Sequence, residues 1–333
     1  MSNAASQLAQ VGTLAQSRLL YLILYANDLT RARDFYEKTL GLTVLESDGS
    51  SAKYDTGQTI LCLRKASEFG VGFTSPDRSA DVTFLVDDLD KVRDSLSGRG
   101  VKFSDTLRYE IGATVDFYDP DGHWISLYQP SDAAMSWPSG QKLKAILRAG
   151  GKDPTNYENS NIPRRYSVPT EITLRGREIV YLFVFVPDPD VAFEFYSGVL
   201  GFRDLERRSC RRGSTENELG VVKYDAGGLM LTTHHREIAP TPKGQQDSQG
   251  LRETSNSQSK AAALVFGVND LDHVTKALSQ KSIDVKVVDR TRDGRTAKLE
   301  DPFGRVLYLL EPSSEALKSR AGLRIDQIMA APL

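Results

Sequence analysis

The chain has 333 residues, 40% of them hydrophobic and 26% charged, which is typical of an ordinary globular protein long enough for two domains. Its formal net charge of −2 provides no attraction for nucleic acid or an anionic membrane, so neither is expected as a partner. The two cysteines, Cys62 and Cys210, are too few for a disulfide framework or a thiolate zinc site. The polar first residues resemble neither a signal peptide nor a membrane span, so a cytoplasmic location is expected by default.

Residues 1–18 are predicted to be a flexible N-terminus, and a regular pattern begins after them. Residues 19–26 are a continuous apolar run, as in a strand buried on both faces. Asp28 is a capping residue ahead of a helix with apolar positions at helical spacing, and Gly41 follows where a left-handed helix stop is expected. Three short strands are predicted next, over 43–47, 51–56 and 59–65.

The same order of elements begins again at Asp81, with a strand over 81–86, a helix ending at Gly100 and strands continuing to Gln129. A β-α-β-β-β unit is therefore predicted twice between residues 19 and 130. The whole pattern then recurs in the second half, where 19–46 match 179–206, 52–63 match 222–233, 84–92 match 266–274, and 118–130 match 300–312. We interpret the chain as a duplicated domain with four such units.

Three segments lie outside the repeats. Residues 131–177 are rich in Pro, Asn and Ser and are predicted to be an interdomain linker over the surface, within which 142–150 has the pattern of a short helix. Residues 239–260 form a polar insertion, which we interpret as a disordered loop in preference to a mobile lid. Residues 314–333 are predicted to be a C-terminal tail.

Three motifs carry a family resemblance: F-Y-x-x-x-L-G at 35–41, V-D-D-L at 86–89 and the D-P-D-G turn at 119–122. Together they resemble the vicinal oxygen chelate superfamily, which includes glyoxalase I, bleomycin-resistance proteins and extradiol dioxygenases. The resemblance implies an α+β fold of tandem glyoxalase-like domains, over 19–130 and 178–313. Each domain would contain two β-α-β-β-β units that form a U-shaped sheet with outer helices. The chain would be a monomer with an internal pseudo-dimer, or a homodimer.

The resemblance also implies four metal-ligand positions on the inner face of each domain. Carried over, they fall in the first domain on Tyr21, Cys62, Asp81 and Ser126. In the second domain they fall on Tyr181, Thr232, Ala263 and Tyr308. A catalytic transition metal needs about three histidine or carboxylate ligands, and Asp81 alone qualifies. We therefore expect no metal site and no cofactor.

Strand alternation assigns residues to the two faces of each sheet. The aliphatic residues Leu20, Leu22 and Leu24, with Val180, Leu182 and Val184, are predicted to pack under the helices. The predicted aromatic walls of the inner face consist of Tyr21, Tyr25, Trp124, Tyr128, Tyr181, Phe183, Phe185 and Tyr308. Such walls suit a hydrophobic or aromatic small molecule, which is the expected partner.

The polar inner-face residues are candidates for proton transfer and ligand contact. Asp81 is predicted to be either a general base or the partner of Arg64 or of a tyrosine hydroxyl. Tyr21 and His234 are the other proton-transfer candidates. Ligand contacts are predicted for Cys62, Arg64, Ser126 and Thr232.

Three functions fit these patterns. The first is metal-independent binding of a hydrophobic or aromatic molecule, as in drug-sequestering proteins. The second is a metal-independent lyase, isomerase or cyclase that uses Asp81, Tyr21 or His234 for proton transfer. The third is a dioxygenase-like or glyoxalase-like metal enzyme with displaced ligands. Metal analysis together with identification of any co-purified ligand would separate them.

Overall fold

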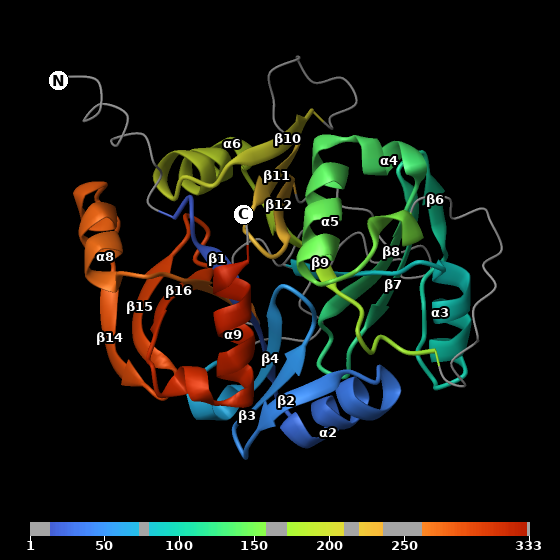
Figure 1. Ribbon diagram of the computed structural model, residues 1–333, viewed down its shortest axis with the longest axis horizontal. Helices are drawn as coiled ribbons and strands as arrows, with labels where there is room; N and C mark the ends of the chain where they lie inside the picture. Colours follow the sequence, from blue (N-terminus) through green and yellow to red (C-terminus); the bar gives the residue numbers. More distant parts are fainter. Residues whose placement is uncertain (1–13, 73–79, 158–171, 210–219, 236–261, 332–333) are drawn as a thin grey trace.

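The computed structural model describes residues 14–72, 80–157, 172–209, 220–235 and 262–331. They form two eight-stranded mixed sheets with helices on the outer faces, an α+β fold (Figure 1). Four β-α-β-β-β units build these sheets, as the sequence predicts. The polar insertion at 239–260 and residues 1–13 and 158–171 lie outside the described residues.

The first copy contains units one and two. Unit one consists of β1 (Arg18–Ala26), α2 (Leu29–Asp34), the π-helical turn η1 (Phe35–Thr39), β2 (Thr43–Ser47), β3 (Ser51–Asp55) and β4 (Ile60–Lys65). A short helix, η2 (Ala66–Phe69), follows it. Unit two consists of β5 (Ala80–Leu85), α3 (Leu89–Ser97), β6 (Leu107–Tyr109), β7 (Gly112–Tyr118) and β8 (Trp124–Pro130).

The second copy contains units three and four. Unit three consists of β9 (Ile179–Val186), α6 (Pro189–Phe193), the π-helical turn η4 (Glu194–Val199), β10 (Asp204–Arg208), β11 (Val221–Asp225) and β12 (Met230–His235). Unit four consists of β13 (Ala262–Gly267), α8 (Leu271–Gln280), β14 (Lys286–Thr291), β15 (Gly294–Glu300) and β16 (Val306–Pro312).

The predicted helix signals act as expected. The side chains of Asp28 and Asp188 accept hydrogen bonds from backbone N–H groups in the first turns of α2 and α6. The helical segment of unit one ends at Gly41, whose φ of 72° is the left-handed conformation that glycine adopts without strain. Gly201 ends the matching segment with a φ of 82°. The same local chemistry therefore shapes both copies.

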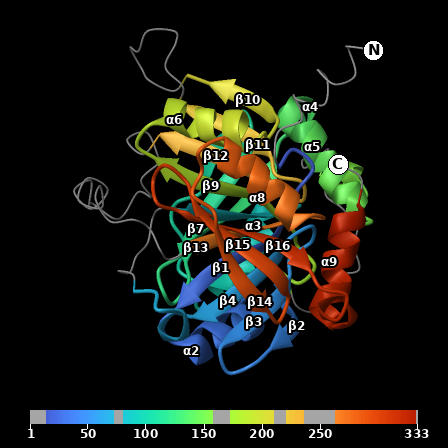
Figure 2. The same cartoon turned by 90° about the vertical axis from the view of Figure 1, so that its left-hand side faces the viewer.

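The pairing of units differs from the expectation that both units of one copy share a sheet. Sheet A has the order β14-β15-β16-β13-β1-β4-β3-β2, so it joins unit one to unit four. Sheet B has the order β10-β11-β12-β9-β5-β8-β7-β6 and joins unit two to unit three. Figure 2 shows β13 beside β1, where Leu22 pairs with Leu264 across an antiparallel ladder. The central strands of the four units are similar apolar runs, so local sequence alone does not determine which of them pair.

The core under the helices contains most of the predicted aliphatic residues. Leu22 and Leu24 of β1 belong to it, together with their counterparts on β9, Leu182 and Val184. Leu20 and Val180 do not, which corrects the predicted alternation at these two positions. Each lies at a β-bulge, after which its side chain joins the inner-face cluster.

Each sheet is followed by helices that pack on its inner face. Residues 131–149 form α4 (Asp132–Ser136) and α5 (Pro138–Ala149), which confirms the predicted helix, and η3 (Pro154–Asn156) follows. Residues 314–331 contain η7 (Ala316–Lys318) and α9 (Arg320–Ala330). Figure 1 shows α5 in front of sheet B and α9 in front of sheet A.

These helices differ from the predicted surface linker and tail. Leu143 and Ile146 of α5 are buried in one cluster with Tyr181, and Ile325 and Ile328 of α9 are buried in another with Tyr21. Both helices have an apolar face at helical spacing, which covers part of an inner face that would otherwise be exposed. Among the described residues, no helix has the length and apolar character needed to cross a membrane.

Residues 14–18, the described part of the N-terminal segment, pack against the rest of the fold. Leu14 is buried, and its N–H donates to the carbonyl of Leu200 at 2.7 Å. The hydroxyl of Ser17 donates to the carbonyl of Leu14 at the same distance. Residues 14–18 are therefore part of the folded body and not of a flexible extension.

Candidate functional site

The swapped pairing sorts the predicted site residues into new groups. Tyr21, Cys62 and Arg64 of unit one face Tyr308 of unit four on the inner side of sheet A, where all four line one cavity. The inner face of sheet B carries the polar residues Asp81, Ser126, Thr232 and His234, together with the predicted aromatic residues Trp124, Tyr128, Tyr181, Phe183 and Phe185. Arg64 and Asp81 lie on different sheets, so the predicted pairing of Asp81 with Arg64 is wrong.

The sheet A cleft is a cavity of about 570 Å³. Its apolar and aromatic wall comes from five elements and includes Tyr21, Cys62, Phe69, Val265, Tyr308 and Leu310. This volume lies within the range of roughly 300–1,000 Å³ that small-molecule sites occupy. Ile325 and Ile328 of α9 pack beside the cavity, in the same cluster as Tyr21.

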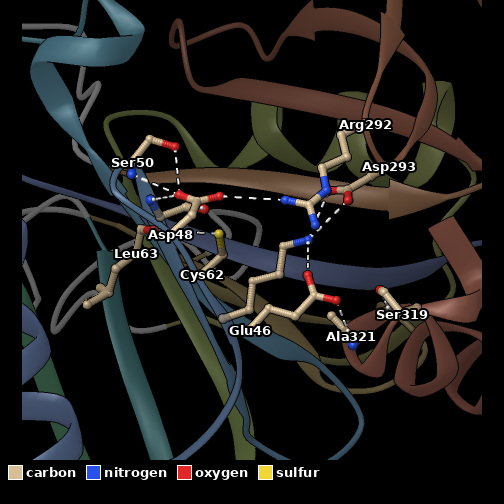
Figure 3. A network of polar contacts seen from close by, with 12 residues as sticks. Glu46, Asp48, Ser50, Cys62, Leu63, Arg292, Asp293, Ser319 and Ala321 are labelled. Atoms are coloured by element: carbon tan, nitrogen blue, oxygen red, sulfur yellow. Dashed lines mark hydrogen bonds and ion pairs between the residues drawn. The ribbon is translucent and has the colours of Figure 1, made fainter.

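A polar network forms one rim of the sheet A cleft (Figure 3). The Nζ of Lys53 lies 3.1 Å from an Asp293 carboxylate oxygen and 3.4 Å from Glu46, so two carboxylates neutralise it. The same Nζ lies 5.2 Å from the centre of the Tyr21 ring. Glu46 also accepts a hydrogen bond of 3.2 Å from the backbone N–H of Ala321, which ties α9 to this rim.

Arg64 has different surroundings. Its guanidinium is half-buried and lies 4.7 Å from the centre of the Phe69 ring. It lies within hydrogen-bonding reach of the Tyr25 hydroxyl and the Cys62 thiol. Burial raises the pKa of both groups above their ordinary values, so both are neutral near pH 7. A buried, protonated thiol is a poor nucleophile, which leaves Cys62 as a wall residue.

Tyr21 also has an unused polar group. Its side chain is only 3% exposed, and its hydroxyl has no hydrogen-bond partner in the described part of the chain. Burial raises the pKa of this phenol well above its ordinary value, so the hydroxyl keeps its proton. A buried donor without a partner is costly, so the hydroxyl is available for a ligand in the cleft.

Sheet B presents a carboxyl pair joined by one hydroxyl. The Oγ of Ser126 lies 2.8 Å from Asp81 Oδ2 and 2.8 Å from Asp116 Oδ1. A serine hydroxyl has one hydrogen, so it donates to one carboxylate and accepts from the other only if that carboxyl is protonated. Burial, reinforced by Asp116, raises the pKa of Asp81 well above its ordinary value, and burial also raises the pKa of Asp116. The raised pKa values and the single hydroxyl hydrogen together favour a proton held between the two carboxyls.

The aromatic side chains of sheet B pack mainly against one another. Trp124 and Phe185 stack with ring centres 5.3 Å apart and an interplanar angle of 15°, and His234 meets Phe185 edge-on at 5.7 Å. Tyr181 contacts Tyr128 at 5.9 Å and Phe183 at 5.6 Å. Most of these ring faces are occupied within the fold, so they form a packed layer.

His234 contacts this layer through the edge of the Phe185 ring. It is half-buried, and burial lowers the pKa of its imidazole, which is therefore neutral near pH 7. Its Nδ1 lies 2.9 Å from the carbonyl oxygen of His235. His123 is buried, with its Nε2 2.9 Å from the carbonyl oxygen of Tyr25.

The fold family implies a metal, and the inherited positions do not fit one. In the sheets that the structure shows, the inherited ligand positions of sheet A are Tyr21, Cys62, Ala263 and Tyr308. Those of sheet B are Tyr181, Thr232, Asp81 and Ser126. The sheet A set contains neither histidine nor carboxylate, and the sheet B set contains one carboxylate. Across the described residues, no three His, Cys, Asp or Glu side chains gather closely enough to hold an ion.

The sequence patterns missed several polar residues of these sites. Lys53 and Glu46 pair in sheet A, and the matching Lys223 and Glu206 pair in sheet B at 2.9 Å. Their recurrence in both copies was a usable signal. Asp116 was also detectable, because it faces away from its apolar neighbours on β7 by simple alternation.

A family model described as "Glyoxalase/Bleomycin resistance protein/Dioxygenase superfamily" matches residues 18–127 and 178–308. These two regions cover more than half of the chain and coincide with the two copies. The chain therefore belongs to this superfamily.

Individual relatives agree with this fold. The crystal structure of glyoxalase I from Zea mays is similar with a TM-score of 0.54 and 16% identity, over 89% of this chain and 92% of that chain. A putative dioxygenase from Bacillus subtilis is similar with a TM-score of 0.55 and 11% identity, over 93% of this chain and 90% of that chain. The uncharacterized protein YraH of Bacillus subtilis is 34% identical over 125 residues, which cover 34% of this chain and 98% of YraH.

Proposed function

We propose that the chain binds a small, ring-containing molecule in the sheet A cleft without using a metal ion. The observation that carries this proposal is the cavity of about 570 Å³, whose walls come from units one and four. In contrast to the packed layer of sheet B, Tyr308 is half-buried and Phe69 is 43% exposed, so both rings present surface to the cavity.

The wall chemistry supports a flat, largely apolar ligand. Val265 and Leu310 provide aliphatic surface, while Tyr21 and Tyr308 provide rings with polar tips. A well-placed ring pair contributes roughly 0.5–1.5 kcal/mol beyond its buried area, and hydroxyls orient the polar groups of a bound molecule.

Replacing Tyr308 should weaken binding more than folding. With 2-naphthamide as an uncharged ring probe, we expect Tyr308→Ala to lower affinity by about three- to tenfold, the equivalent of one ring contact. Tyr181→Ala is the matched control, because its ring is buried against Tyr128, Phe183 and the helix α5. This control should lower the melting temperature and leave affinity unchanged. Fluorescence titration beside thermal melting measures both, and unchanged affinity in Tyr308→Ala would count against the proposal.

The protein should bind no stoichiometric transition metal. The re-paired ligand sets lack the histidines and carboxylates that Fe, Mn, Ni or Zn requires. Elemental analysis of protein purified without added metal should therefore find far less than one ion per chain. About one tightly held ion per chain, lost in Asp81→Asn or His234→Ala, would instead support a dioxygenase-like or glyoxalase-like enzyme with displaced ligands.

A second candidate function is metal-independent proton transfer on the inner face of sheet B, as in a lyase, isomerase or cyclase. The hydroxyl of Ser126 between two buried carboxyls favours it, as does the second oxygen of Asp81, which has no hydrogen-bond partner in the described structure. A carboxyl with a raised pKa is suited to act as an acid or base near neutral pH. If a substrate is identified, Asp81→Asn should abolish turnover and retain binding.

A further inference from the structure

We propose that the sheet A cleft selects ring-containing molecules that carry an acidic group, and that Arg64 binds the anion. This inference rests on the proposed function, because it specifies the polar end of the ligand bound there. It goes beyond that function by giving the cleft a charge preference, which the aromatic walls do not determine.

Among the described residues that line the cavity, one guanidinium has no carboxylate ion pair. Lys53 is paired with Glu46 and Asp293, and Arg292 lies 3.8 Å from an Asp48 carboxylate oxygen. The described residues provide no carboxylate ion pair for Arg64, whose polar partners are the Cys62 thiol and the phenols of Tyr25 and Tyr308. A partly buried cation with neutral partners loses hydration without full compensation, so an anionic ligand would restore the balance.

A second donor faces the same cavity. The Tyr21 hydroxyl is buried, keeps its proton and has no partner within the described chain. A carboxylate accepts hydrogen bonds at both oxygens, so it can use the guanidinium and the phenol together. The ring of such a ligand would then lie against Tyr308 and Phe69, which flank Arg64 in the cavity wall.

Sheet B provides an internal comparison. The repeat aligns Arg64 with His234, whose imidazole is neutral near pH 7, and sheet B adds the carboxyl pair of Asp81 and Asp116. One inner face therefore carries a guanidinium that has no carboxylate ion pair among the described residues, and the other carries a carboxyl pair. The anion preference is specific to sheet A and follows from its side chains, not from the architecture.

Two probes that share one ring system test this charge preference. Calorimetric titration of the full chain with 2-naphthoate and 2-naphthamide should show about tenfold or greater preference for the carboxylate, as expected for a charge-assisted hydrogen bond. Arg64→Met should bring the two affinities within about twofold, because it lowers the affinity for the carboxylate more than the affinity for the amide. Arg64→Lys, which keeps the charge but loses the bidentate geometry, should retain part of the preference.

Lys65→Met is the matched control. Lys65 is adjacent on β4, points to the opposite face of the strand and pairs with Glu68 at 3.2 Å. Lys65→Met removes one positive charge, as Arg64→Met does, but the preference for naphthoate should persist. Equal binding of the two probes by the unmodified protein would overturn the anion inference and leave the proposed function standing. Failure of both probes to bind would overturn the proposed function and this inference with it.

Discussion

Deleting residues 314–333 is expected to lower the free energy of unfolding by roughly 5 kcal/mol or more, a loss comparable to the whole stability margin of many domains. The segment contains α9, whose Ile325 and Ile328 are almost fully buried against the inner face of sheet A. Its removal also breaks the ion pair of 3.2 Å between Arg324 and Asp55. Urea unfolding followed by circular dichroism measures the change.

Single substitutions on α9 separate packing from helix formation. Ile328→Ala removes buried surface and should cost roughly 2–5 kcal/mol. Leu323 lies on the same helix and is 55% exposed. Leu323→Ala should therefore change the free energy of unfolding by no more than about 0.5 kcal/mol. If the truncated chain unfolds at the same urea concentration as the full chain, α9 does not stabilise sheet A and the account of the inner face is wrong.

Asp81→Asn is expected to stabilise the protein at pH 8 by roughly 1–3 kcal/mol, the usual cost of a buried polar group in unfavourable surroundings. Burial, with Asp116 nearby, raises the pKa of Asp81, so the folded protein holds a proton that the unfolded chain has already released. The native state then binds more protons than the unfolded state above the ordinary carboxyl pKa. Stability therefore falls as pH rises from about 4 through the raised pKa.

Asparagine keeps the shape of the side chain and does not ionise, so the variant should lose part of this pH dependence. Asp116→Asn should act in the same direction. The double variant should gain less than the sum of the two, because the carboxyls share one hydroxyl and one proton. Asp105→Asn, on the exposed surface, is the control for a change in net charge. Urea unfolding at pH 5 and pH 8 measures the slope, and a slope unchanged in both single variants would contradict the shared proton.

Local features of the fold could be predicted because short-range chemistry determines them. The cap at Asp28, the stop at Gly41 and the strand alternation that turns Tyr21 and Tyr181 inward depend on a few neighbouring residues. Alternation failed at Leu20 and Val180 because a β-bulge inserts one residue and shifts the face. No pattern in the apolar runs around these residues distinguishes a bulged strand from a regular one.

The composition of each site could not be predicted, since it depends on which units share a sheet. The repeat makes the central strands of all four units similar, and β1 could pair with β5 or β13 without changing its own sequence. This ambiguity is why Asp81 was assigned to the cleft of Arg64. The residues themselves were correctly placed on inner faces, but their partners across the sheet were exchanged.

The packing of α5 on an inner face, and the helix α9 itself, were not predicted. The two helix pairs follow β8 and β16 at equivalent positions. Their sequences share a Pro-Ser pair before the helices, Ala134 and Ala316 in the first helix, and a glycine and an isoleucine in the second. These glycines, Gly140 and Gly322, lie so close to the carbonyls of Ala134 and Ala316 that a Cβ would come within 2.2 Å and 1.9 Å of them. This steric requirement for glycine depends on how closely the two helices of each pair approach each other, which the sequence does not give.

The exchange of units between the two sheets has a consequence for how this chain can diversify. In a homodimer of single-copy chains, two-fold symmetry would make both inner faces identical, and every substitution would appear in each. Here each sheet combines one unit from either copy, and the two combinations share no residue. One inner face can therefore acquire an arginine while the other acquires a carboxyl pair, as Arg64 and Asp81 illustrate. Because the two copies are fused in one chain, a substitution in one face leaves the other unchanged. Neither half of the chain contains a complete sheet, so both halves are needed for each face.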